Sequence, residues 1–231
     1  MTADDLPAAF ESIPAAWREA LPGWTEPACR NVIDRVRAVS ADRAIGPPDP
    51  FRALRFAKPE EVRVVIFGQD PYPGAGVADG LAFSASTGRP PSLRRVFDVL
   101  EADQAGYKRP AVWKLDRWAR QGVLLLNPTL TIEIGAIGSH ISCGWQALTS
   151  QIVQILWSMP AAPTFLLWGK PASSFFDVIT QPPVGIRTLR TRHPSNDFRR
   201  EFMAEGSHFV ATRTLVDWWA MDTPADHRDI V

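Results

Sequence analysis

Short apolar runs in this chain end in residues that could do chemistry together. The runs are found at residues 62–70, 122–129, 164–171 and 185–195. Their ends present Asp70, Asn127, the Gly169-Lys170 turn and His193. A carboxylate and an imidazole can move protons or stabilise charge, and a side-chain amide carries a hydrogen-bond donor beside an acceptor. These groups become informative if the fold brings them to one place.

The apolar runs predict the elements that would position these groups. The first three runs are apolar without alternation, as in strands of a parallel sheet that helices cover on both faces. Helical patterns separate them, at residues 92–105, 112–121 and 144–159. We therefore predict an α/β fold, a three-layer α/β/α domain with a central, mostly parallel four-stranded sheet. Ligands of open α/β sheets bind beyond the carboxyl ends of the strands, so the four turns should share one rim.

A simpler interpretation exists for each residue taken alone. An Asn or Asp after a strand is often only a turn residue, and a histidine before proline is often an ordinary loop residue. For a single position this simpler interpretation is favoured. Four such turns on one rim favour a site.

Composition places the chain among ordinary globular proteins. Its 231 residues suit a single domain over 1–231, with 1–7 and 222–231 as flexible ends. Apolar residues make up 45% and charged residues 22%. No apolar run approaches the roughly 20 residues of a membrane span, and the start shows no secretory signal pattern. Two distant cysteines, Cys29 and Cys143, favour a cytoplasmic protein without a disulfide.

Charge and histidine content narrow the function classes. The formal net charge is zero, so no overall basic character indicates nucleic-acid binding. Residues 187–200 nevertheless hold five arginines, which is either a local basic surface or a chance cluster in a solvated loop. The four histidines form no Cys/His pair at ligand spacing, which argues against structural zinc. Elsewhere, residues 28–40 predict a helix, and the proline-rich stretch 44–56 predicts an irregular connection.

Six ordered motifs resemble those of the family 1 uracil-DNA glycosylases. They are "GQDPYPGAGVADGLAFS" (68–84), "PPSL" (90–93), "GVLLLNPTLT" (122–131), "SH" with "GW" (139–145), "LLWGKPA" (166–172) and "HPS" (193–195). The resemblance runs from about residue 45 to 220. It implies hydrolysis of the N-glycosidic bond between uracil and deoxyribose in DNA, without a metal or other cofactor. Such chemistry requires the base to leave the stack.

The resemblance also assigns roles to the residues at the sheet rim. It makes Asp70 the catalytic anion that stabilises a cationic sugar and orients or deprotonates the attacking water. It makes His193 a neutral donor to uracil O2. Asn127 would read uracil N3–H and O4. The remaining uracil-binding residues would be Gln69 through its backbone, Tyr72 as the wall that excludes the thymine methyl, and Phe83 as the stacking ring.

The same resemblance implies a set of DNA contacts. Pro71, Ser92, Gly169, Lys170 and Ser195 match positions at which the family meets the DNA backbone. The partner would be uracil-containing DNA, single- or double-stranded, with the protein acting as a monomer away from membranes.

The chain departs from the family pattern at several positions. Pro73 and Asp79 stand where the family usually has histidines, and Lys170 replaces a serine. Asn196 and Asp197 replace the loop that carries a wedge leucine, the side chain that fills the space of the flipped base. We predict that Phe198, or an arginine beside it such as Arg199, takes the wedge role. The family's DNA-mimic inhibitor protein binds that leucine in a pocket. We therefore predict that this chain binds the inhibitor weakly or not at all.

Three alternative functions remain open from the sequence. A related glycosylase could accept a different range of bases, because Pro73 and the altered loop lie at positions that affect base specificity. A DNA-binding protein that has lost turnover is a second alternative, against which Asp70, Asn127 and His193 together argue. An enzyme acting on free nucleotides fits poorly with phosphate-contact serines on separate loops.

Overall fold

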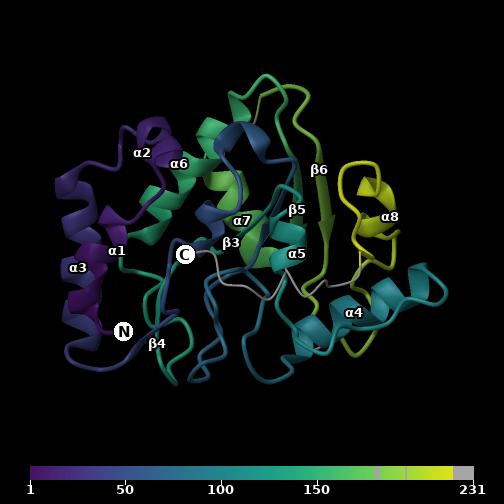
Figure 1. Cartoon of the computed structure of the whole chain (residues 1–231), viewed down its shortest axis with the longest axis horizontal. Helices are drawn as coiled ribbons and strands as arrows, with labels where there is room; N and C mark the ends of the chain where they lie inside the picture. Colours follow the sequence, from purple (N-terminus) through teal and green to yellow (C-terminus); the bar gives the residue numbers. More distant parts are fainter. Residues whose placement is uncertain (180–182, 196, 221–231) are drawn as a thin grey trace.

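A parallel sheet forms the centre of the molecule (Figure 1). The computed structural model describes residues 1–179, 183–195 and 197–220. The strands are β2 (Val64–Phe67), β3 (Val123–Leu126), β5 (Thr164–Trp168) and β6 (Thr188–Thr191), in the order β3-β2-β5-β6. Every neighbouring pair is parallel. The prediction of four strands is confirmed, and the sheet is parallel throughout.

Burial explains the different compositions of the strands. Every residue of β2, β3 and β5 is buried, so these strands need apolar side chains on both faces. Strand β6 lies at the sheet edge and is only half-buried. It therefore tolerates its threonines and arginine.

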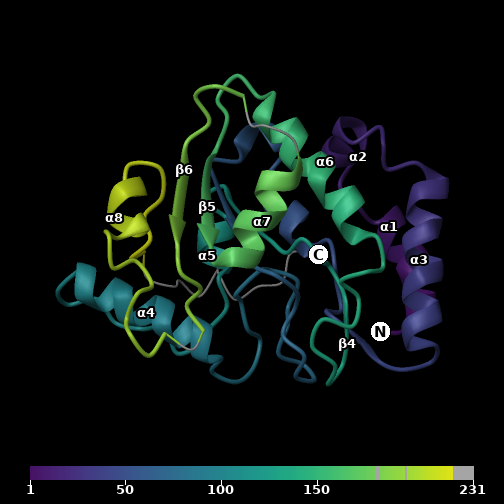
Figure 2. The same cartoon turned by 180° about the vertical axis from the view of Figure 1, so that it is seen from behind.

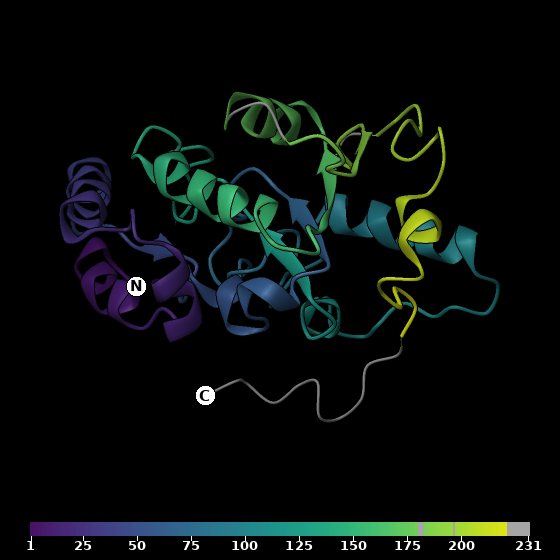
Figure 3. The same cartoon turned by 90° about the horizontal axis from the view of Figure 1, so that it is seen from above.

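Helices cover both faces of the sheet, as predicted. α6 (Trp145–Trp157) and α7 (Lys170–Ile179) lie on one side, and α5 (Asp116–Ala119) lies with the short helix η2 (Arg52–Arg55) on the other (Figure 3). α4 (Pro91–Asp103) and α8 (His208–Thr212) flank the β6 edge (Figure 2). α7 was not predicted, and α5 is much shorter than the predicted segment 112–121. None of the helices in the described residues is long and apolar enough to cross a membrane.

The N-terminal segment packs beyond the β3 side of the sheet (Figure 1). It contains η1 (Ala3–Asp5), α1 (Leu6–Glu11), α2 (Ala15–Ala20) and α3 (Glu26–Ser40), and α3 confirms the helix predicted at 28–40. Residues 1–7, which were predicted to be flexible, make tertiary contacts in the structure. Ala3 and Leu6 are completely buried, and Asp4 pairs with Arg37 of α3. The other predicted flexible end, 222–231, lies outside the described residues.

A small second sheet corrects the prediction for the proline-rich stretch. β1 (Ile45–Gly46) pairs antiparallel with β4 (Ile132–Glu133). The stretch also contains η2, and η3 (Pro59–Glu61) follows it. The prolines prevent long elements here, but they leave room for a two-residue strand and a single helical turn.

Candidate active site

A cavity opens at the carboxyl ends of the central strands and collects most of the predicted site. Its volume is about 170 Å³, slightly more than the roughly 150 Å³ that holds a benzene-sized ring. Asp70 follows β2, Asn127 follows β3 and His193 follows β6. The lining also includes Pro47, Pro50, Gly68, Gln69, Pro71, Tyr72, Pro73, Ala78, Gly80, Leu81, Phe83, Ser92, Leu130, Ile137 and Ser195. The sheet rim therefore brings together the acid, the amide and the imidazole.

Asp70 is held by a residue far away in the sequence. The backbone N–H of Gly138 donates to Oδ2 of Asp70 at 2.9 Å. Partial burial raises the pKa of Asp70 above its ordinary value, while this hydrogen bond opposes the rise because it favours the charged form. One carboxylate oxygen is thus fixed by the protein, and the other can face a ligand.

His193 is oriented through its own loop. The N–H of Ser195 donates to Nδ1 of His193 at 3.0 Å. Because Nδ1 accepts, a neutral imidazole carries its proton on Nε2. Burial lowers the pKa of His193 and so favours this neutral form. Gly169 permits the close approach, since a Cβ there would lie 2.7 Å from the His193 Cβ.

The Asn127 amide lies against a glycine and is free to bind a ligand. Its side chain is 8% exposed, and within residues 1–179, 183–195 and 197–220 no protein group hydrogen-bonds to it. A Cβ at Gly68 would lie 2.1 Å from its Oδ1, so only glycine leaves space for the amide there. The amide lines the cavity, so its donor and acceptor are available to a ligand there.

Two aromatic residues shape the cavity wall. Phe83 adopts φ +65°, a conformation that side chains of this size rarely accept, and its ring lies 5.1 Å from Trp168 and 5.7 Å from His193. Tyr72 donates its hydroxyl to the Phe83 carbonyl at 3.2 Å and shares a 2.8 Å hydrogen bond with the Ser92 hydroxyl. Burial raises the pKa of Tyr72, so the phenol stays neutral. Both rings are therefore held in place before a ligand arrives.

Comparison with known proteins identifies the family. The model of the uracil DNA glycosylase superfamily matches residues 55–215. The chain belongs to the uracil DNA glycosylase superfamily.

Relatives and solved structures agree with this membership. The uracil-DNA glycosylase of Bordetella petrii is 37% identical over 96% of this chain and 93% of its own length. That of Salmonella agona is 42% identical over 80% and 83%, respectively. The mimivirus uracil-DNA glycosylase, at 22% identity, shares the fold with a TM-score of 0.64 over 84% of this chain and 69% of that chain. The enzyme from Nitratifractor salsuginis does so at 21% identity with a TM-score of 0.58, over 84% and 90%.

Not all the residues matched to DNA contacts in this superfamily member reach the cavity. Pro71, Ser92 and Ser195 line it, but Ser92 is buried and its hydroxyl is engaged by Tyr72. Gly169 supports His193 instead of facing the cavity. Three residues lie outside the lining and are exposed: Lys170 at the start of α7, Phe198 and Arg199.

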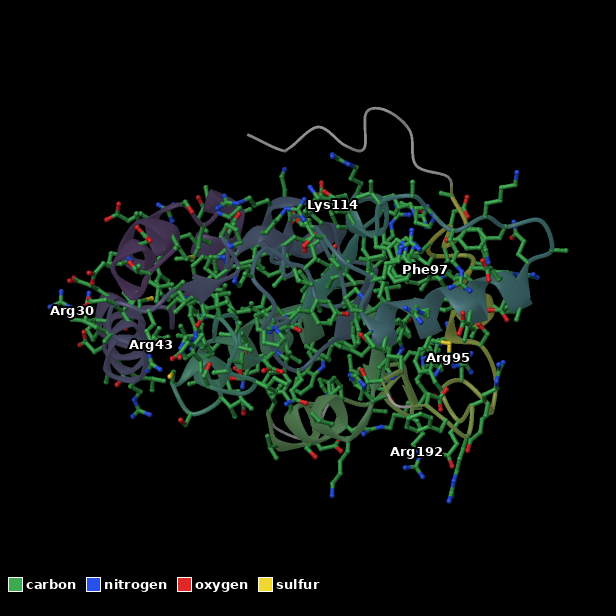
Figure 4. All side chains as sticks on the ribbon, turned by 90° about the horizontal axis from the view of Figure 1, so that it is seen from below. Arg30, Arg43, Arg95, Phe97, Lys114 and Arg192 are labelled. Carbon is green, nitrogen blue, oxygen red and sulfur yellow. The ribbon has the colours of Figure 1, made fainter. Side chains whose placement is uncertain are left out.

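The loop after His193 is anchored by an aspartate that faces inward. Asp197 accepts from Arg95 Nε at 2.7 Å and from the N–H of Glu201 at 2.7 Å, and Arg95 reaches from α4 toward this loop (Figure 4). Burial alone would raise the pKa of Asp197, but these bonds lower it overall. The Asp197 side chain is therefore turned inward, whereas neighbouring Phe198 is 91% exposed.

The basic character of residues 187–200 is only partly available to a ligand. Arg190 pairs with Asp177 at 2.6 Å, and Arg192 lies 3.5 Å from Glu201. Arg192 still points outward from the surface (Figure 4). Arg190 and Arg192 thus have acidic partners outside the stretch, and Arg190 lies in strand β6.

The departures at Pro73 and Asp79 have structural partners. The Pro73 carbonyl accepts from the N–H of Gly135 at 2.9 Å. Asp79 is buried, accepts from the Ser84 hydroxyl at 2.6 Å and lies 3.5 Å from Arg52. Burial raises the pKa of Asp79, outweighing the Ser84 hydroxyl and Arg52, which favour its charged form. No group of three potential metal ligands occurs among the described side chains.

Sequence reasoning missed one functional residue and part of the wall. Gly138 was not predicted to touch Asp70, although the glycines at 135 and 138, followed by "SH", mark a tight turn there. Pro47 and Pro50 line the cavity, whereas the proline-rich stretch was predicted only as a connection.

Proposed function

We propose that this chain is a family 1 uracil-DNA glycosylase that acts as a cytoplasmic monomer. It flips uracil out of single- or double-stranded DNA, hydrolyses its N-glycosidic bond and leaves an abasic site, which starts base excision repair. The observation that carries the proposal is the convergence of Asp70, Asn127 and His193 on one ring-sized cavity, in a chain with relatives of this activity at about 40% identity. The ordered motifs support the assignment to family 1.

Asp70 would act on the sugar. As the bond between C1′ and N1 breaks, its electron pair leaves with uracil and positive charge develops on deoxyribose. A fixed carboxylate next to that charge stabilises it without needing to reorganise. Asp70 also orients the attacking water and takes its proton as the new C1′–O bond forms.

His193 would stabilise the leaving base. Uracil departs as an anion with charge on O2, and the Nε2–H of a neutral imidazole can donate to that oxygen. The Nδ1 hydrogen bond from Ser195 supports this role because it leaves the proton on Nε2. A strong general acid is not needed, because a uracil anion is a better leaving group than the alkoxide in sugar hydrolysis.

Asn127 would select the base. Its amide can pair with uracil N3–H and O4 together, whereas cytosine presents the opposite donor pattern. A good bidentate pair provides roughly 1–3 kcal/mol of discrimination, and the lack of competing protein partners supports this assignment. Gln69, Tyr72 and Phe83 would complete the uracil pocket, with the Phe83 ring as the stacking surface.

DNA would be held around this pocket through several loops. We assign backbone contacts to Pro71, Ser92, Gly169 and Ser195, and to the charges of Lys170 and Arg199. Phe198 is the wedge in this scheme, since it is exposed beside the anchored Asp197. An apolar ring can enter the space that a flipped base leaves.

The proposed wedge predicts weak inhibition by a DNA-mimic protein. A variant of the mimivirus enzyme has been solved in complex with UGI. A bulkier phenylalanine, displaced along a loop of altered sequence, should fit poorly into an inhibitor pocket that accepts leucine. Titration of uracil release with this inhibitor should therefore show weak inhibition, and tight stoichiometric inhibition would contradict the wedge assignment.

Base release from defined oligonucleotides tests the function. Strands carrying uracil, thymine, cytosine or hypoxanthine are assayed unpaired, opposite guanine and opposite adenine. We expect free uracil alone to be released in all three contexts. Release of another base would indicate the altered range that Pro73 and the loop leave open, and binding without release would indicate lost turnover.

A further inference from the structure

A polar network that is buried except for the exposed Arg43 lies behind the loop that holds Asp70. Its members are Ser40 at the end of α3, Arg43, Thr131, Glu133 of β4 and His140. His140 and Thr131 are completely buried, and no part of the proposed chemistry uses them. Arg43 lies beside the end of α3 at the N-terminal side of the molecule (Figure 4). The network thus joins the N-terminal segment to the cavity wall.

The hydrogen bonds of this network form a continuous chain. Trp145 Nε1 donates to Thr131 Oγ1 at 2.8 Å, and Thr131 Oγ1 lies 2.9 Å from Nδ1 of His140. On the other side, Nε2 of His140 lies 2.8 Å from Ser40 Oγ, which donates to Glu133 at 3.1 Å. Burial lowers the pKa of His140, while the Glu133 carboxylate raises it in part. With a neutral His140 every donor in the chain has an acceptor.

The network fixes both ends of the loop that contacts the aspartate turn. Glu133 precedes this loop and His140 ends it, and the Glu133 N–H donates to Ser139 Oγ at 2.9 Å. Between them, Gly135 donates to the Pro73 carbonyl and Gly138 donates to Asp70 Oδ2, each at 2.9 Å. The loop therefore donates two hydrogen bonds to the turn that carries Asp70.

We propose that the His140 network is a positioning device for Asp70, acting through the backbone N–H of Gly138. Breaking the network inside the protein would let the 134–139 loop shift, so that Asp70 loses its donor although neither residue is changed. Ser40 and Arg43 take part from outside the region that matches the superfamily model, residues 55–215. The inference rests on the proposed role of Asp70.

Two threonines provide a matched test. Thr131 and Thr212 are both completely buried, and each accepts an indole N–H, from Trp145 at 2.8 Å and from Trp218 at 3.0 Å. Thr131→Val breaks the network, and Thr212→Val makes the same chemical change in α8. Both should lower the melting temperature to a similar extent.

Single-turnover kinetics and NMR distinguish positioning from stability. For Thr131→Val we expect a uracil-release rate lower by about tenfold, as for a small displacement of a catalytic group, with unchanged DNA affinity. The acid limb of its rate–pH profile should move to higher pH, because a carboxylate that loses a donor is protonated more easily. His193 and Tyr72 are the other titratable groups named at this cavity, and neither is changed in the variant. Glu133 and Arg43 are the charged groups of the network, and they are also retained. Thr212→Val should keep the wild-type uracil-release rate and the wild-type position of the acid limb.

A second variant keeps the proposal testable if Thr131→Val unfolds. Gly138 has φ +72°, and a Cβ there would lie 3.1 Å from the Ile141 side chain, so Gly138→Ala disturbs the same N–H from the loop itself. If both changes act through the Gly138 N–H, the double variant should release uracil no more slowly than the slower of the two single variants. NMR titration of the Asp70 carboxyl carbon measures the same effect without activity. An inactive wild type would refute the proposed function, whereas an unchanged Asp70 titration in Gly138→Ala and in folded Thr131→Val would refute only the network.

Discussion

Phe83 and Phe198 present their rings in opposite ways. Phe83 is 7% exposed and held at φ +65° between Trp168 and His193. Phe198 is 91% exposed. The difference fits the proposed function, with a division of work in which a preorganised pocket would perform the chemistry and a projecting ring would act on the duplex.

The hydrogen bonds and ion pairs that hold the two segments also differ. The Phe83 turn is tied by the Tyr72 hydroxyl and, through Ser84, by the Asp79–Arg52 pair. Phe198 follows Asp197, through which Arg95 anchors the loop. A change in the pocket should therefore affect every substrate, and a change in the loop should affect duplex DNA selectively.

The largest effect is expected at Asp70. Asp70→Asn keeps the shape but removes the negative charge opposite the sugar cation, so uracil release should fall by about 10³-fold on single strands and duplexes alike. Single-turnover rates measure this, with binding followed separately. Asp177→Asn on α7 is the matched control and should retain its rate. A comparable loss in the control would remove Asp70 from its role.

Asn127 should have the next largest effect. Asn127→Ala removes the amide that pairs with uracil, which should cost about tenfold to hundredfold in rate, the equivalent of 1–3 kcal/mol. The ratio of uracil to cytosine release should fall as well. An unchanged ratio would show that other groups read the base.

A smaller and selective effect is expected at Phe198. Phe198→Ala should slow uracil release from duplex DNA by about tenfold and leave single strands nearly unaffected, because only a duplex must be opened. Val178→Ala shortens another exposed apolar side chain, 76% exposed on α7, and should change neither rate. Equal decreases in rate on duplex and single-stranded DNA would instead indicate that Phe198 contributes to the uracil pocket.

The smallest effect is expected at Lys170. Lys170→Ser removes one exposed charge at the start of α7, so DNA affinity should weaken a few-fold and the slope of log affinity against log salt should fall by about one. Binding measured at several salt concentrations gives this slope. An unchanged slope would mean that Lys170 contacts no phosphate.

Local patterns in the sequence predicted the sheet and the three groups on its rim. β2, β3 and β5 are buried on both faces, so their apolar runs and the polar residues that end them are visible without the fold. Contacts between distant segments were not predictable. Gly138 reaches Asp70 across 68 positions, and Arg95 reaches Asp197 across 102. No local pattern encodes such pairs.

The conformation of Phe83 was hidden for a related reason. A positive φ is expected at glycine and not at phenylalanine. It persists here because surrounding hydrogen bonds, such as that from Tyr72 to the Phe83 carbonyl, outweigh the local preference. The same applies to residues 1–7, whose burial against α3 depends on tertiary contacts with few local signals.

The most direct test compares one uracil oligonucleotide, single-stranded and in duplex, with the wild type, Asp70→Asn and Phe198→Ala. Single-turnover uracil release is measured for all six combinations. The proposed division of work predicts that Asp70→Asn lowers both rates by the same factor and that Phe198→Ala lowers only the duplex rate. Equal losses on both substrates for Phe198→Ala, or substantial release by Asp70→Asn, would contradict it.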